Sequence, residues 1–222
     1  MILMPATLDD WRHQLSEPKT RPTSNVSQLT ERWRNASGFP VEIASLFATT
    51  EATRRATVLV VVPNHQVPLA GGAHASGLDL WVLARTAGGL LSVTIDAIGA
   101  EAFDADARDR PATTTHERLW RGLRHLLEID ESANLPVSCQ LVHRTTAALV
   151  EAKRFFARSA AVIVHSFSQG VEGFGDFQRF VQLMGGARVE PGRLVEVRPR
   201  EGIELFFGWA QAPHVGAATS GA

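Results

Sequence analysis

The chain has 222 residues, 45% of them hydrophobic, with 22 basic residues, 23 acidic residues and a formal net charge of −1. This length and composition predict one domain with one sizeable core. The nearly balanced charge excludes an overall electrostatic attraction to nucleic acid or to an anionic membrane, so any such contact requires a local patch. No stretch approaches the roughly 20 apolar residues of a membrane span, and we expect no membrane association.

The N-terminal residues 1–24 combine several prolines and charges, which predicts an arm on the domain, with a short helix around Leu8 to Leu15. The single domain is expected over residues 25–209. The tail of residues 210–222 offers nothing to bury, so we expect it to be disordered. Within the domain, SQLTERWRNA and VEIASLFAT predict two helices separated by Gly38 and Pro40.

An apolar, β-branched run at residues 56–62 is typical of a central strand covered on both faces, and Pro63 is expected to end it. A long loop containing His65 and His74 would follow. Two loop histidines without a third ligand are more typical of solvated side chains than of a metal site.

Residues 77–104 predict two strands joined by a tight Gly-containing turn, of either two residues (Ala87-Gly88) or four. Apolar residues alternate on both strands, and placing them on the same side sets the register. The expected opposing pairs are Leu80 with Ile95, Val82 with Val93, and Ala84 with Leu91.

That register places Asp79 directly opposite Asp96, and two like charges in this arrangement repel. A divalent cation would remove the penalty, since Mg²⁺ is commonly held by one or two carboxylates together with water and phosphate oxygens. The alternative is that both residues lie at exposed strand ends where water screens them.

The second half of the chain begins with a helix expected from about Thr114 to Ile129 and a longer one from about Ser138 to Arg158. On the longer helix a polar row lies opposite the apolar side and is interpreted as a solvated face; it consists of Gln140, Arg144, Glu151 and Arg154. The single cysteine, Cys139, excludes an internal disulfide and favours a reducing compartment, so we expect a cytoplasmic protein.

A buried strand is expected at residues 160–165, then a helix from Phe174 to Leu183 ended by Gly185-Gly186, a loop, and a last strand at residues 203–209. The order of elements predicts an α/β fold with a mixed sheet flanked by helices. The motifs of the commonest phosphate loops, dinucleotide sites, esterases and zinc proteases do not occur in the sequence.

Several segments together resemble an uncharacterised bacterial family thought to have the core of the PD-(D/E)xK (restriction-endonuclease-like) nucleases. The segments are VPNHQVPLAGG, SGLDLWVLAR, TIDAIGAEAF, QLVHRTTAALVEAKRF and AVIVHSFS. The likeness covers most of residues 27–209 and depends on the order and spacing of the pieces. It implies a helix carrying an acid, a three-strand meander with two acids, and a following helix with a glutamine.

Carried over residue by residue, the resemblance implies that Glu42, Asp79 and Asp96 bind Mg²⁺ or Mn²⁺ and that Gln140 lies beside them. Ile98 stands where the family pattern has a lysine that orients or activates the attacking water. Arg144 or Arg154, on the same helical row as Gln140, could supply the missing charge, although arginine does not readily exchange a proton.

The sequence is compatible with three functions. One is a metal-dependent phosphodiesterase acting on nucleic acid with a rearranged catalytic site. The second is a catalytically inactive module of the same fold that binds nucleic acid or a protein partner, and the third is a structural protein.

Overall fold

A computed structural model describes residues 24–69, 75–100, 103, 114–129, 138–168, 170 and 172–212. The predicted arm (residues 1–24) therefore lies outside the described residues except for Ser24, and so does the predicted tail beyond residue 212. The helix predicted around Leu8 to Leu15, His74 and the loop segments around them also fall outside.

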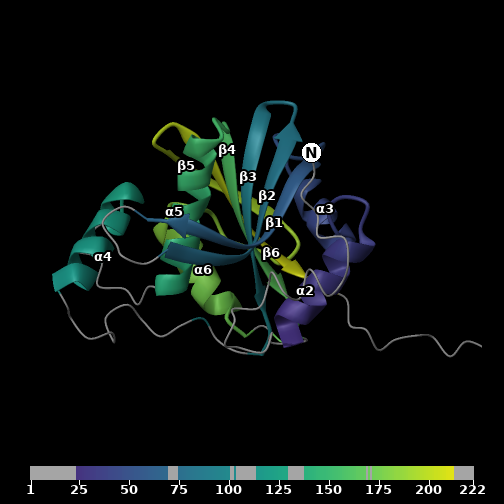
Figure 1. Ribbon diagram of the computed structural model, residues 1–222, viewed down its shortest axis with the longest axis horizontal. Helices are drawn as coiled ribbons and strands as arrows, with labels where there is room; N and C mark the ends of the chain where they lie inside the picture. The colour runs from purple at the N-terminus through teal and green to yellow at the C-terminus, as the bar shows by residue number, and fades with distance from the viewer. Residues whose placement is uncertain are drawn as a thin grey trace, which may run out of the picture.

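The described chain forms a mixed α/β fold with one six-stranded sheet, in the order β1-β2-β3-β4-β6-β5, and helices on both faces (Figure 1). The strands are β1 (Thr57–Pro68), β2 (Ala75–Thr86), β3 (Gly89–Ile98), β4 (Ser159–Ser166), β5 (Leu194–Arg200) and β6 (Ile203–Gln211). The helices are α2 (Ser24–Asn35), α3 (Val41–Phe47), α4 (Thr114–Leu126), α5 (Cys139–Arg154) and α6 (Phe174–Leu183). The predicted α/β class with a mixed sheet is confirmed.

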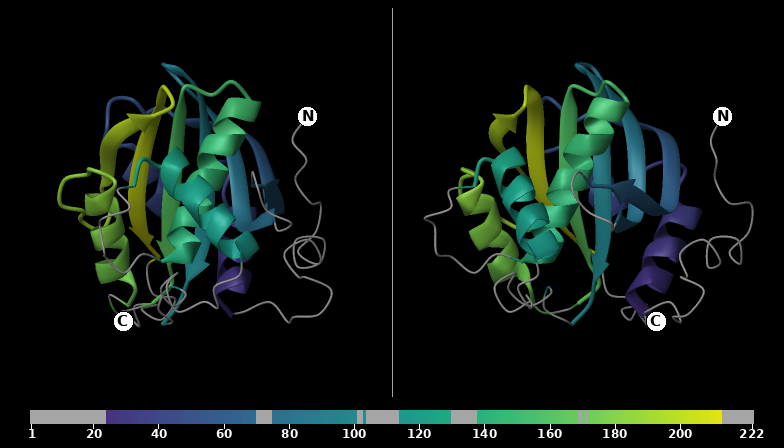
Figure 2. Two further views of the ribbon diagram at one scale, coloured as in Figure 1. Left: turned by 90° about the vertical axis from the view of Figure 1, so that its left-hand side faces the viewer. Right: turned by 60° about the vertical axis from the view of Figure 1, so that its left-hand side comes forward.

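Strand direction reverses at β2 and again at β3, stays the same through β4 and β6, and reverses once more at β5. The pairs β1-β2, β2-β3 and β5-β6 are antiparallel, whereas β3-β4 and β4-β6 are parallel. Each parallel connection needs a crossover, and these crossovers contain α5 and α6. Both helices therefore lie against the same face of the sheet, as Figure 2 shows from the side.

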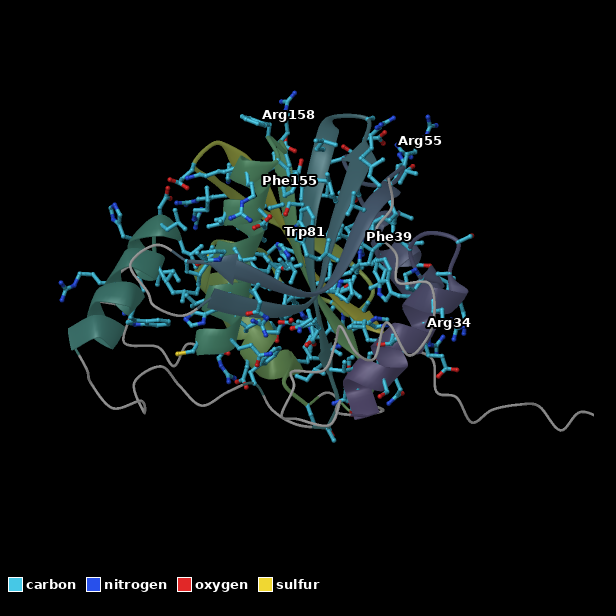
Figure 3. The ribbon with its side chains drawn as sticks, in the orientation of Figure 1. Arg34, Phe39, Arg55, Trp81, Phe155 and Arg158 are labelled. Atoms are coloured by element: carbon cyan, nitrogen blue, oxygen red, sulfur yellow. The ribbon has the colours of Figure 1, made fainter. Side chains whose placement is uncertain are left out.

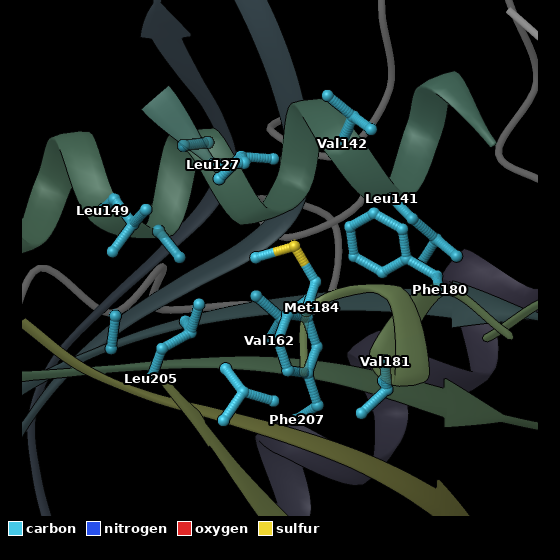
Figure 4. Close-up of a cluster of buried hydrophobic side chains, with 14 of the residues drawn as sticks. Leu127, Leu141, Val142, Leu149, Val162, Phe180, Val181, Met184, Leu205 and Phe207 are labelled. Carbon is cyan, nitrogen blue, oxygen red and sulfur yellow. The ribbon is translucent and has the colours of Figure 1, made fainter. Parts of the chain in front are cut away.

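The two faces of the sheet have separate cores. On one face α4, α5 and α6 cover residues such as Val162, Leu205 and Phe207 (Figure 4). On the other face α2 and α3 cover residues such as Val93 and Ile163. Because successive strand residues point to opposite faces, odd-numbered β3 positions belong to the α2-α3 face and even-numbered ones to the α5 face.

The β1-β2 hairpin bends sharply near Asn64, which has a φ of +46°. Before the bend, Val61 belongs to the core under α2 and α3; beyond it, Val67 and Leu78 belong to the core under α5. The far part of the hairpin thus curls over α5. Simple alternation along the strand would put Leu78 on the same face as Leu80, but the bend places it in the other core.

Two strand predictions were wrong. The first strand does not end at Pro63 but continues to Pro68, and it is the partly exposed edge strand of the sheet instead of a central one. The loop predicted before the last strand contains β5, which forms the opposite edge. Proline is tolerated in both because an edge strand leaves some backbone N–H positions unpaired.

Candidate active site around Asp79 and Asp96

The predicted register between β2 and β3 is confirmed: Leu80 opposes Ile95, Val82 opposes Val93 and Ala84 opposes Leu91. Thr86 opposes Gly89, so the turn consists of Ala87 and Gly88, the shorter of the two expected turns. The alternating apolar residues fix this register because a slip of one position would turn every side chain to the wrong face.

Beyond Leu80 and Ile95 the regular pairing ends, and the two aspartates join the strands through their side chains. The backbone amide of Ala97 donates to Oδ2 of Asp79 at 2.8 Å. In return, the backbone amide of Asp79 lies 3.4 Å from Oδ1 of Asp96. The two carboxylates therefore lie next to each other, as the sequence predicted, and each accepts a hydrogen bond from the other strand's backbone.

Arg144 of α5 completes the cluster. Its Nε forms an ion pair with Oδ2 of Asp96, and its Nη1 lies 3.2 Å from the hydroxyl oxygen of Ser76 at the start of β2. Only 16% of the Arg144 side chain and 7% of the Asp96 side chain are exposed. Arg144 can reach Asp96 because Ser138 caps α5, with its Oγ accepting from the amide of Leu141, and α5 then runs along the sheet.

The electrostatics of the cluster are unbalanced, because two carboxylates, that of the buried Asp96 and that of the half-buried Asp79, face one guanidinium group. Burial, together with the smaller effect of the negative charge of Asp96, raises the pKa of Asp79 from 3.8 to about 7. The hydrogen bond from Ala97 and the positive charge of Arg144 oppose this rise. A second positive charge at this position would relieve the repulsion.

Ile98 and Gln140 do not add polar contacts to the pair. Ile98 is 5% exposed and belongs to the apolar core together with Phe103. Gln140 lies in the first turn of α5, and within the described residues it makes no hydrogen bond to Asp79 or Asp96.

Glu42 lies on the opposite face of the sheet from the pair. Its Oε1 is 3.1 Å from Nε2 of His165 in β4 and 3.7 Å from Nε of Arg32. His165 is fully buried and shares the β4 face of Ala161 and Ile163, which pack under α2 and α3. Burial on its own would raise the pKa of Glu42, but the hydrogen bond with His165 and the charges of His165 and Arg32 lower it.

The polar row predicted on α5 is not a solvated face, contrary to expectation. Glu151 is completely buried; its Oε1 lies 2.8 Å from Nη1 of Arg154 and 3.4 Å from Nε2 of His65. His65 stacks on Trp81, with ring centroids 5.2 Å apart. The curled β1-β2 hairpin covers Glu151, because the strand continues beyond Pro63, where the sequence predicted its end; Arg154 at the end of the row stays exposed.

The metal-binding capacity of the cluster is limited to the two aspartates. Among the residues that the structure describes, no three His, Cys, Asp or Glu side chains are grouped so that they could hold a metal ion. Two carboxylates correspond to a half-site for Mg²⁺, which usually retains several water molecules. Glu101, a further acid near the end of β3 in the sequence, lies outside the described residues.

Fold and site together define a mixed α/β protein with a largely buried aspartate pair, one member of which forms an ion pair with an arginine of α5. No described helix is long and apolar enough to cross a membrane. A family model described as a domain of unknown function (DUF6946) matches residues 5–214, so the chain belongs to this family. Searches of curated proteins and of solved structures found no match.

Proposed function

We propose that the chain is a divalent-cation-dependent phosphodiesterase that acts on nucleic acid, with a core like that of the PD-(D/E)xK nucleases. The observation that carries the proposal is the position of Asp79 and Asp96. They lie side by side on neighbouring strands, at the start of the helix that supplies Arg144.

The order of the elements around the pair supports the proposed core. An antiparallel meander of β1, β2 and β3 is followed by α5 and then by β4, which is parallel to β3. The meander followed by a helix is the succession that the sequence resemblance implies. The acids occupy the second and third strands, as in that pattern.

The residues present fit the proposed chemistry in part. Asp79 and Asp96 are hard oxygen ligands, and a bound Mg²⁺ or Mn²⁺ would polarise a phosphoryl oxygen and lower the pKa of a coordinated water. Arg144 would supply the positive charge that a lysine at position 98 would supply in the family pattern. It can stabilise charge on a phosphate but cannot take up a proton.

Calorimetric titration with MgCl₂ and MnCl₂ near neutral pH tests the proposal. We expect binding by the native chain and none by Asp79→Asn, with cleavage of a labelled oligonucleotide lost in parallel. Asp176→Asn is the matched control, because Asp176 is an exposed aspartate that pairs with Arg179 on α6. Absence of cation binding by the native chain at millimolar concentration would rule out the proposed cation-dependent phosphodiesterase.

A second candidate is a catalytically inactive module of the same fold that binds nucleic acid. Two observations favour it: Arg144 already occupies one oxygen of Asp96, and Ile98 packs in the core where a lysine would be needed. This candidate predicts salt-sensitive association with DNA or RNA that persists in EDTA. A gel-shift series without a shifted species would exclude it.

A further inference from the structure

The C-terminal end of α5 carries an aromatic residue that both packing and backbone preference disfavour. Phe156 is 91% exposed and has a φ of +54°. The amide of Ala157 donates to the carbonyl of Ala152, and that of Phe156 to the carbonyl of Lys153. This is a Schellman motif, in which the left-handed position is usually glycine. Because a bulky residue there costs about 1 kcal/mol or more, stability alone would favour glycine.

Phe155, the residue before Phe156, packs against the rest of the protein, whereas Phe156 does not. The ring of Phe155 lies 4.8 Å from that of Trp81, centroid to centroid, and covers the helix end (Figure 3). Phe156 makes no ring contact among the described residues. Its side chain is therefore available to a ligand.

Three exposed arginines lie at the same end of the sheet. Arg85 is opposite Thr57 of β1 and Leu90 of β3, and the amide of Arg158 donates to the carbonyl of Leu90 at 3.1 Å. Arg55 immediately precedes β1, and Figure 3 shows it projecting from the same end of the molecule as Arg158. Within the described part of the chain, none of the three arginines forms an ion pair.

Some acidic residues lie near these arginines in the sequence or across paired strands, and each of them already has a partner. Glu51 pairs with Arg54, Glu201 pairs with Lys153, and Glu204 accepts a hydrogen bond from the hydroxyl of Ser159 at 2.9 Å. The hydroxyl of Ser159 leaves the charge of Glu204 uncompensated, so three arginines stand against one carboxylate and the excess charge of this region is positive, although the net charge of the chain is −1. Such a region is complementary to a polyanion.

We propose that Phe156, Arg55, Arg85 and Arg158, here called the Phe156 surface, bind single-stranded nucleic acid. A base would stack on the exposed ring while neighbouring phosphates contact the guanidinium groups. A single strand fits better than a duplex, because paired bases are already stacked and do not present their faces. The proposal deepens the proposed function by naming the form of the substrate, and it rests on that function for the identity of the polymer.

The position of the surface suits a strand that also reaches the acidic pair. Arg85 is six residues along β2 from Asp79, which corresponds to roughly 20 Å at about 3.3 Å per residue. The helix α5 runs in the same direction, from Arg144 at the acidic pair toward Phe156 at the Phe156 surface. A strand of a few nucleotides would span this distance.

Fluorescence anisotropy with a labelled oligothymidine of about 20 nucleotides, in EDTA and at about 50 mM salt, tests the proposal. We expect the single strand to bind more tightly than a duplex of equal length. Phe156→Gly should weaken binding about 5- to 150-fold, the range of one stacked base, while its melting temperature stays equal or rises. Phe156→Trp should retain the affinity.

Charge controls separate the surface from general attraction. Arg158→Gln should reduce the slope of log affinity against log salt by about 0.7, which corresponds to one phosphate contact on a single strand. Arg34→Gln makes the same charge change on α2, well away from the surface in Figure 3, and should leave affinity and slope unchanged.

Three results would overturn the proposal. They are equal binding by Phe156→Gly and the native chain, absence of single-strand binding at micromolar protein, and a native dimer in sedimentation that Phe156→Gly dissociates. The last result would assign the surface to a second copy of the chain. Oligonucleotide binding by Asp79→Asn without cation binding by the native chain would leave this inference intact and remove only the phosphodiesterase.

Discussion

Arg144 of α5 and Asp96 of β3 form an ion pair across the interface between helix and sheet, and both side chains are largely buried. The same arginine also contacts Ser76 of β2. It therefore ties the helix to both strands that carry the acidic pair. Its removal would leave two neighbouring carboxylates without a counter-charge.

We predict that Arg144→Gln lowers the free energy of unfolding by about 2 to 4 kcal/mol at pH 7.5, since breaking a buried pair leaves an uncompensated charge. Urea denaturation measures the change. Arg179→Gln breaks an exposed pair with Asp176 and should cost less than about 0.5 kcal/mol. Equal, small losses for the two variants would show that Arg144 does not neutralise the pair.

The raised pKa of Asp79 predicts a specific pH dependence. The folded chain binds this proton up to about pH 7, whereas the unfolded chain releases it near 3.8. Between these values the folded state holds more protons, so the contribution of Asp79 to stability falls as pH rises, by up to about 1.4 kcal/mol per pH unit. Above pH 7 the loss is complete.

Asp79→Asn should therefore be more stable than the native chain at pH 8, by a few kcal/mol, with the difference shrinking toward pH 4. Asparagine retains the acceptor for the amide of Ala97 and carries no charge. Chemical denaturation of both chains across this range measures the effect, with Asp176→Asn as the reference. A difference that does not change with pH would contradict the raised pKa.

Glu42 is predicted to stabilise the fold and to have no part in cation binding. Its pKa is lowered, so its contribution is present above the ordinary value of 4.5 and is lost as pH falls through the folded value. Glu42→Gln should cost about 1 to 2 kcal/mol at pH 7, less than a fully enclosed charged hydrogen bond, because Glu42 borders a cavity of about 560 Å³.

Urea denaturation at pH 7 and at about pH 3.5 measures this loss, and calorimetry should show unchanged cation affinity. Glu31→Gln, which removes an exposed acid lining the same cavity, is the matched control. A loss of cation binding in Glu42→Gln would place Glu42 at the metal after all.

Restoring the lysine of the nuclease pattern should fail. Ile98 is 5% exposed in the apolar core, and its Cδ1 lies close to Gly173, so Ile98→Lys should cost about 3 kcal/mol or more. Ile98→Leu should cost less than about 1.5 kcal/mol. Thermal unfolding compares the two variants. A stable Ile98→Lys variant that gains cleavage would show that a lysine at this position can leave the core and reach the acidic pair.

The pairing of β2 with β3 could be predicted from the sequence because its signal is local. Apolar residues at every second position fix which side chains share a face, and the turn at Ala87-Gly88 fixes the register. The adjacency of Asp79 and Asp96 follows from these two facts. The end of α6 was also predicted from a local signal, the pair Gly185-Gly186; the amide of Gly186 donates a hydrogen bond to the carbonyl of Val181.

Other features depended on contacts between distant segments. The burial of Glu151 results from the hairpin curling over α5, and that bend depends on a left-handed Asn64 that no periodicity signals. The strand β5 was missed because Leu194 to Arg200 is a short edge strand whose Pro199 resembles a turn.

The sequence by itself determined the α/β class, the helix and strand alternation and the pairing of Asp79 with Asp96, because these follow from residue periods of 3.6 and 2. Only the tertiary structure decided that Arg144 joins the pair while Glu42 binds His165 on the other face. The reason is physical: periodicity defines the faces of one element, whereas packing between elements chooses which faces meet.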